Sequence, residues 1–112
     1  MARLSYVELP AKTTGPLIDF YTGAFGCDFT DYGPDYAATT TNDVELGLNA
    51  STDAAIAFLL PLFQVEDLEA ALERVIAGGG TITVPIFAYP GGRRFHFKDP
   101  AGNELGAFVA EE

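Results

Sequence analysis

The segment QVEDLEAALERVIAGGG (residues 64–80) indicates a short amphipathic helix that follows a strand and ends in a turn. Asp67 is a typical N-cap residue, because its carboxylate can accept a hydrogen bond from a backbone N–H group of the first helical turn. Glycines 78–80 allow the left-handed backbone that often ends a helix. The apolar residues between them recur at helical spacing, and they are Leu68, Ala71, Leu72, Val75 and Ile76. The segment therefore predicts a helix over 67–77 with one buried face.

Extended segments flank this predicted helix on both sides. An apolar strand is expected at about 56–65, and three more strands are expected at 81–87, 93–98 and 104–109. The sequence DPAGN (residues 99–103) joins the last two strands, and its Pro and Gly favour a tight turn. The second half of the chain thus has the order strand, helix, three strands.

The first half has the same order. A strand is expected over 3–9, stopped by Pro10, and a helix begins near 14–16, where Pro16 suits the first helical turn. This helix ends near Gly26 and is expected to pack on a sheet through residues at helical spacing, which are Leu17, Phe20, Tyr21 and Ala24. Three extended segments follow at 27–32, 36–41 and 44–49, separated by turn signals at 33–35 and 42–43.

The two halves form an internal repeat of supersecondary structure. A shift of about 53 residues superposes Thr14 on Asp67 and Gly26 on Gly79. A chain of 112 residues buries one core more readily than two independent ones. We therefore expect a single domain over 1–112, with one module at about 1–52 and a second at about 53–112.

The order and spacing of these motifs resemble the vicinal oxygen chelate superfamily, which includes glyoxalases, bleomycin-resistance proteins and extradiol dioxygenases. In the first half the resemblance lies in YVELP (residues 6–10), the pair Phe20-Tyr21 and the pair Phe25-Gly26. In the second half it lies in QVEDL (64–68), GGG (78–80), PGGRRFHF (90–97) and DPAGNE (99–104). The resemblance implies an α+β fold in which two βαβββ modules form a curled mixed sheet around a cleft, with the helices outside.

The metal enzymes of this superfamily hold a divalent ion on four inward-facing strand positions. The resemblance matches these positions to Tyr6, Glu45, Leu60 and Gly106. Leu60 and Gly106 carry no ligating side chain, and one carboxylate does not hold a specific metal ion. We therefore expect no metal and no other cofactor. The glyoxalase and dioxygenase reactions, which depend on the metal, are in doubt for this chain.

Strand alternation places Arg94, His96 and Lys98 on one face of their strand, and Arg93, Phe95 and Phe97 on the other. The resemblance implies that the face with Arg94 and His96 points into the cleft. It places seven further residues there as ligand contacts, namely Tyr6, Glu8, Glu45, Leu62, Gln64, Glu104 and Phe108. Tyr32 and Tyr36 are secondary candidates, since tyrosines beside a turn more often pack than bind.

Arg94 and His96 allow several functions. The leading one is reversible binding of a small organic molecule, with an anionic group on Arg94. A second is a metal-independent lyase or isomerase in which His96 moves a proton and Arg94 stabilises negative charge. A third is a non-catalytic protein-interaction module. Alternatively, Glu8 or Glu104 neutralises Arg94 and His96 in an internal pair that merely fills the cleft.

Composition excludes some partners. Six Lys and Arg against sixteen Asp and Glu give a net charge of −10, which disfavours nucleic acid and anionic membrane surfaces. The longest apolar stretch, residues 54–63, is about half the roughly 20 residues that a membrane-spanning helix needs. We therefore expect a cytoplasmic protein that takes a small-molecule ligand. We also expect a homodimer, because two modules in so short a chain leave a partly open sheet.

Overall fold

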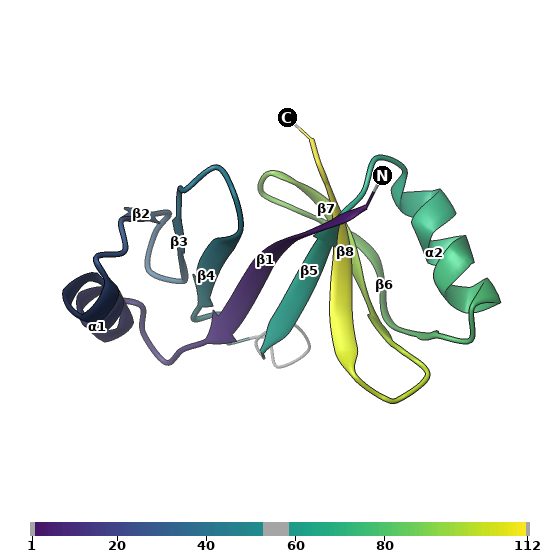
Figure 1. Ribbon diagram of the computed structural model, residues 1–112, viewed down its shortest axis with the longest axis horizontal. Coiled ribbons are helices and arrows are strands. Elements are labelled where there is room, and N and C mark those ends of the chain that lie inside the picture. The colour runs from purple at the N-terminus through teal and green to yellow at the C-terminus, as the bar shows by residue number, and fades with distance from the viewer. Residues whose placement is uncertain (1, 53–58, 112) are drawn as a thin grey trace. The chain divides into compact units, whose positions relative to one another are not determined.

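The computed structural model describes residues 2–52 and 59–111, which divide into two compact units (Figure 1). Unit 1 comprises Met1–Ser5 and Leu60–Glu112, and unit 2 comprises Tyr6–Leu59. The first residues of the first strand thus belong to unit 1. No helix in the described part of the chain is long and apolar enough to cross a membrane.

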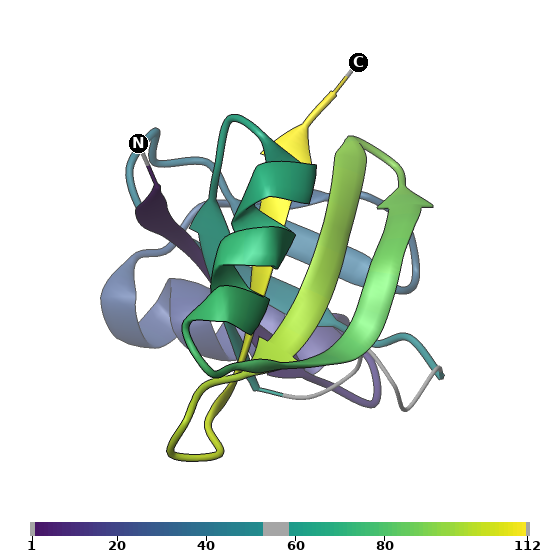
Figure 2. The ribbon, with the colours of Figure 1, turned by 90° about the vertical axis from the view of Figure 1, so that its right-hand side faces the viewer.

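Unit 1 contains β5 (Leu60–Gln64), α2 (Leu68–Ala77), β6 (Thr81–Tyr89), β7 (Gly92–Lys98) and β8 (Glu104–Ala110). Its strand order is β5-β8-β7-β6, with β5 and β8 parallel and the other pairs antiparallel. The helix lies across one face of β6, β7 and β8 (Figure 2). Of the strand predicted at 56–65, β5 contains Leu60–Gln64, while Leu59 and Val65 lie outside it. Residues 56–58 lie outside the described residues.

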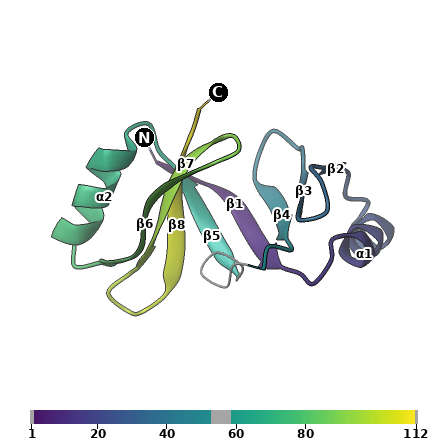
Figure 3. The same cartoon turned by 180° about the vertical axis from the view of Figure 1, so that it is seen from behind.

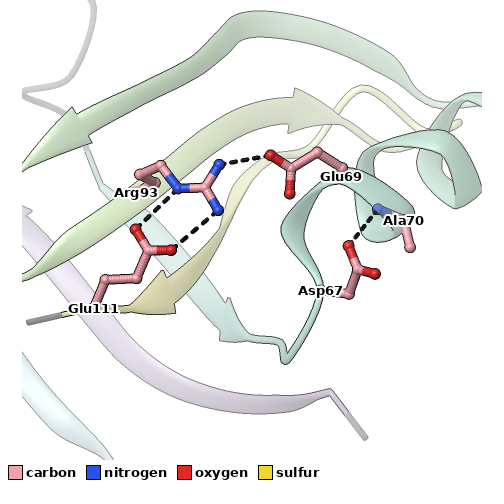
Figure 4. Close-up of polar contacts among 5 residues, drawn as sticks. All are labelled: Asp67, Glu69, Ala70, Arg93 and Glu111. Atoms are coloured by element: carbon pink, nitrogen blue, oxygen red, sulfur yellow. Dashed lines mark hydrogen bonds and ion pairs between the residues drawn. The ribbon is translucent and has the colours of Figure 1, made fainter.

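The helix α2 forms as its sequence predicts. The Asp67 carboxylate accepts a hydrogen bond from the Ala70 N–H group at 3.0 Å (Figure 4), and Gly79 takes the left-handed backbone with φ of 97°. Leu68 and Ala71 on its apolar face form a buried cluster with Val65, Phe95 and Ala107. Full burial of a side chain such as Phe95 contributes about 1.5–3 kcal/mol. This cluster is the core of unit 1.

Unit 2 contains most of β1 (Arg3–Pro10) with α1 (Gly15–Phe25), β2 (Phe29–Asp31), β3 (Tyr36–Thr39) and β4 (Glu45–Asn49), seen from behind in Figure 3. Its strand order is β2-β3-β4-β1, with β1 and β4 parallel. In both units the strands, numbered by their order in the chain, lie in the sheet in the order first, fourth, third, second. This shared topology confirms the internal repeat and the α+β class.

The prediction that α1 packs on a sheet is wrong. The helix buries none of its residues, and Phe20 and Phe25 are 58% and 73% exposed. The rings of Phe20, Tyr21 and Phe25 instead contact one another along the helix, at centroid distances of 5.1 and 6.4 Å. The apolar spacing was sufficient to form the helix, but it did not determine what the helix would contact.

Candidate functional site

Strand β7 directs its two arginines to opposite faces of unit 1. Arg93 lies on the α2 side, where its guanidinium binds Glu69 of α2 at 2.6 Å and Glu111 at 2.9 and 3.1 Å (Figure 4). Phe95 also lies on that side, in the core against α2. Arg94 and His96 therefore lie on the face away from α2, as the alternation predicts. They are 5% and 0% exposed.

Two aromatic rings from β6 contact the Arg94 guanidinium. Its central carbon lies 5.5 Å from the centroid of the Phe87 ring and 5.2 Å from that of Tyr89. Both distances are in the range of cation–π contacts, in which the face of an aromatic ring attracts a cation. The sequence analysis missed Phe87 and Tyr89, because it considered the alternation of β7 alone.

His96 is packed among apolar groups. Its ring meets Phe87 edge to face at a centroid distance of 5.7 Å. On the neighbouring strand it faces Gly106, where an added Cβ would lie 3.3 Å from His96 Cδ2 and only 2.4 Å from Leu62 Cδ2. Leu60 Cδ2 would lie 3.3 Å from the same position. The space that a side chain at position 106 would need is thus filled by leucine and histidine.

The strand register brings most of the predicted unit 1 residues to this face. Phe108 is opposite Arg94 on β8 and also opposite Gln64 on β5, and Leu62 is opposite Gly106. Gln64 accepts a hydrogen bond from the Ser5 hydroxyl at 3.5 Å. Glu104, near the end of β8, accepts one from the Thr83 hydroxyl at 2.6 Å. Leu62 and Phe108 thus lie on the same face as Arg94 and His96, and Gln64 and Glu104 make polar contacts there.

In unit 2, Glu8 is a buried carboxylate that contacts a tyrosine across an intervening strand. Glu8 is 3% exposed, and the Tyr36 hydroxyl donates a hydrogen bond to its Oε2 at 3.0 Å. The phenol passes over Gly47, where an added Cβ would lie 2.4 Å from the Tyr36 oxygen. Tyr36, a secondary candidate from the sequence, thus orients a predicted site residue. Gly47 was not recognised from the sequence, because its role depends on this contact.

Tyr6 and Glu45 are opposite each other on β1 and β4. Burial, together with nearby Tyr32, Glu45 and Glu8, raises the pKa of the half-buried Tyr6 phenol. The Glu45 carboxylate accepts hydrogen bonds from Thr41 at 2.8 Å, Thr39 at 2.7 Å and Asn42 at 2.9 Å. Burial acts to raise the pKa of Glu45, but these hydrogen bonds together hold it below its ordinary value.

The four positions that the resemblance matches to metal ligands do not fit a metal ion. In unit 1, Leu60 and Gly106 offer no donor, and Leu62 fills the space beside Gly106. In unit 2, Glu45 is engaged by its own hairpin and Tyr6 holds its proton more tightly than an ordinary tyrosine. Within residues 2–52 and 59–111, no group of three or more His, Cys, Asp or Glu side chains is placed to hold a metal. No chemical step is therefore derived through a metal.

A cavity of about 200 Å³ lies elsewhere in unit 1, at the C-terminal end of α2. It is lined by Arg74, Val75, Gly78, Gly80, Phe97, Asp99 and Pro100. None of the predicted site residues contributes to its lining. That all nine predicted ligand contacts of units 1 and 2 serve one ligand stays a prediction.

Comparisons with solved structures show the fold. A structure described as NAD-dependent benzaldehyde dehydrogenase from Legionella pneumophila is 19% identical with a TM-score of 0.79, covering 95% of this chain and 98% of that one. Methylmalonyl-CoA epimerase from Streptomyces coelicolor is 13% identical with a TM-score of 0.78, covering 98% of each chain. A glyoxalase/bleomycin resistance protein/dioxygenase superfamily member from Vibrio splendidus is 17% identical with a TM-score of 0.69, covering 99% and 100%.

The family assignment comes from the sequence. No curated protein gives a significant match to the chain. The family model described as Glyoxalase/Bleomycin resistance protein/Dioxygenase superfamily matches residues 3–106, from the start of β1 to the first residues of β8. The chain therefore belongs to the glyoxalase/bleomycin resistance protein/dioxygenase superfamily.

Proposed function

We propose that this chain reversibly binds a small organic carboxylate on the face of unit 1 that lies away from α2. Arg94 binds the anionic group, His96 lies beside it, and Leu62 and Phe108 contribute apolar contacts. The site acts without a metal, because the matching ligand positions lack the donors that a metal needs. The proposal concerns binding and assigns no reaction to the chain.

The observation that carries the proposal is the buried position of Arg94. A guanidinium that is 5% exposed acts in surroundings of low dielectric, where a charge-assisted hydrogen bond to a carboxylate is strong. The chain as a whole has a net charge of −10 and repels anions. The proposal is thus supported by a buried arginine on a sheet face of a protein whose net charge is negative.

The fold is compatible with a bound organic ligand. The Streptomyces coelicolor epimerase, which has the same fold, is in complex with 2-nitronate-propionyl-CoA. At 13% identity this comparison supports the fold and transfers no residue to the present chain. The choice of a carboxylate rests on Arg94 alone, because a guanidinium donates two parallel hydrogen bonds to such a group.

The test is a thermal-shift screen of small carboxylic acids, phenols and aromatic amines, followed by titration calorimetry on the acids that stabilise the protein. We expect acids to stabilise the wild type, Arg94→Ala to lose about 2–5 kcal/mol of binding free energy, and His96→Ala to lose less. Arg93→Ala is the matched control, because Arg93 lies on the opposite face against Glu69 and Glu111. It should bind acids as the wild type does.

Two outcomes would contradict the proposal. If acids stabilise Arg94→Ala as strongly as the wild type, the site lies elsewhere. If Arg94→Ala lowers the melting temperature of the ligand-free protein and no acid stabilises the wild type, Arg94 serves as an internal ion-pair partner. A catalytic role for His96 would be indicated if His96→Ala retained affinity for a substrate but lost its turnover.

A further inference from the structure

Two turns of unit 1 that the proposed function does not use meet at the cavity of about 200 Å³. One is the turn at residues 78–80 after α2, and the other is the turn at 99–103 between β7 and β8. They lie at the same end of unit 1 (Figure 2), where a Cβ added at Gly79 would be 3.8 Å from Pro100 Cγ. The cavity is lined by Phe97, which packs on the core cluster at α2. It is therefore on the opposite side of the sheet from Arg94.

The core of unit 1 fixes the apolar walls of this cavity. Val75 and Phe97 both pack against the core cluster, and the Phe97 ring centroid lies 5.9 Å from that of the buried Phe95. Gly80 is packed closely as well, since an added Cβ would lie 2.7 Å from Val75 Cγ1 and 3.1 Å from the Lys98 carbonyl oxygen. Walls held in this way need little reorganisation to accept a ligand. A cavity of about 150 Å³ can bind benzene, so this one has room for a small apolar body with polar groups.

Two side chains of opposite charge also line the cavity, and they do not pair with each other. The Asp99 Oδ1 atom accepts hydrogen bonds from the Ala101 and Asn103 N–H groups at 2.9 Å, while Oδ2 accepts only one, from the Asn103 amide at 2.9 Å. The Asn103 amide, together with the N–H groups of the turn, holds the pKa of Asp99 below its ordinary value. Asp99 is therefore ionised at neutral pH, and its Oδ2 can accept a second hydrogen bond.

Arg74, in the last turn of α2, carries the positive charge. Within residues 2–52 and 59–111, no side chain forms an ion pair or a hydrogen bond with its guanidinium. Arg74 is exposed, and its long side chain can turn toward a ligand in the cavity that it lines. The cavity thus offers an apolar wall with one anionic and one cationic group beside it.

We infer that this cavity is a second binding site, and that its ligand is a small zwitterion with an apolar body, of the kind that aliphatic amino acids represent. The ammonium group binds Asp99 Oδ2 and lies near the C-terminal end of α2, whose partial negative charge attracts cations. The carboxylate binds Arg74, and the apolar body packs on Val75, Phe97 and Pro100. A ligand with only one charge leaves one of the two groups without a partner. The inference does not rest on the proposed function, because the two sites lie on opposite sides of the sheet.

The test compares three probes with the same branched body. They are leucine, 4-methylpentanoate, which lacks the ammonium group, and 3-methylbutylamine, which lacks the carboxylate. Titration calorimetry measures affinity, and NMR locates binding through the backbone amide signals of residues 78–80 and 101–103. We expect leucine to bind about threefold to tenfold more tightly than either single-charge probe, because each of these partly exposed charges loses one partner.

Two variants assign the charges to residues. Arg74→Gln should weaken leucine and 4-methylpentanoate by about threefold to tenfold and leave 3-methylbutylamine unchanged. Asp99→Asn keeps a side-chain oxygen for the turn and should weaken leucine and 3-methylbutylamine only. Arg93→Gln is the matched control, because Arg93 pairs with two glutamates outside the cavity, and it should bind all three probes as the wild type does. Each titration is repeated in Arg94→Ala, since the proposed function places carboxylates at Arg94.

Selective weakening in the two variants, unchanged in the Arg94→Ala background, would support the inference. It is overturned if leucine does not shift the amide signals of residues 78–80 and 101–103, or if it binds no better than the single-charge probes. Equal weakening of all three probes in Arg74→Gln overturns it as well. Loss of leucine binding in folded Arg94→Ala also overturns it, because leucine would then bind on the opposite face. If Asp99→Asn does not fold by circular dichroism, the three probes on Arg74→Gln decide the result.

Discussion

Gly106 is the position where the smallest change should have a large effect on unit 1. In Gly106→Ala, the new methyl carbon would lie 2.4 Å from Leu62 Cδ2 and 3.3 Å from both His96 Cδ2 and Leu60 Cδ2. These three side chains are at most 3% exposed, so they cannot move aside into solvent. Overpacking of this kind costs about 1–3 kcal/mol. The free energy of unfolding should fall by that amount, and the melting temperature by roughly 4 °C for each kcal/mol.

Urea denaturation measures this effect, and two further variants test its cause. Gly23→Ala is the matched control, because Gly23 lies within α1 and an added Cβ meets nothing within 4 Å. It should stabilise the protein by about 0.5–1 kcal/mol through helix propensity. Leu62→Ala alone should cost about 2–5 kcal/mol by leaving a cavity. Combined with Gly106→Ala it should cost at least about 0.5 kcal/mol less than the sum, because the new methyl group enters that cavity.

Wild-type stability in Gly106→Ala would refute the reasoning, because Leu62 would then have room to turn away. Strictly additive effects in the double variant would refute it as well, since they would show that positions 62 and 106 do not compete for the same space. The Gly23→Ala control must keep or raise stability for either comparison to count.

Three further predictions concern the rest of the chain. The pKa of Glu45 is lower in the folded protein than its ordinary value of 4.5, so its contribution to stability is present above that pH and is lost as the pH falls through the folded pKa. Glu45→Gln should therefore be less stable than the wild type in urea at pH 7, with a gap that narrows in acid. Asp67→Ala should cost about 0.5–2 kcal/mol by removing the cap to Ala70, measured by thermal unfolding, and Asp67→Asn should restore most of it. Sedimentation equilibrium at tens of micromolar should give twice the mass of one chain, and a monomer would reject the predicted homodimer.

Local patterns in the sequence were sufficient to predict the order of the helices and strands and the helix α2. The Asp67 cap, the helical spacing after it and the glycines at 78–80 each act over a few residues, so α2 was predicted from 67–77 and forms at Leu68–Ala77. The same holds for β7, where alternation alone correctly separated Arg93 from Arg94. The repeat of strand, helix and three strands was also readable, because each element has its own periodicity.

The surroundings of the candidate site depend on residues that are distant in the sequence. Tyr36 contacts Glu8 only because β3, β4 and β1 are neighbours and Gly47 leaves room between them. The exposure of Phe20 on α1 was likewise unreadable, since helical spacing says which residues share a face and not whether another element covers it. Such contacts arise from strand pairing and packing, which the sequence pattern does not specify.

The sequence by itself determined the order of the elements, the repeat and the face of β7 that carries Arg94 and His96, because these follow from local periodicity. Only the tertiary structure decided that Phe87 and Tyr89 accompany Arg94. Alternation along β6 is broken by a register shift on each side of Val84, and the pairing of β6 with β7 determines where these shifts are placed. Such a shift is a property of two paired strands, so a pattern read along one strand cannot locate it.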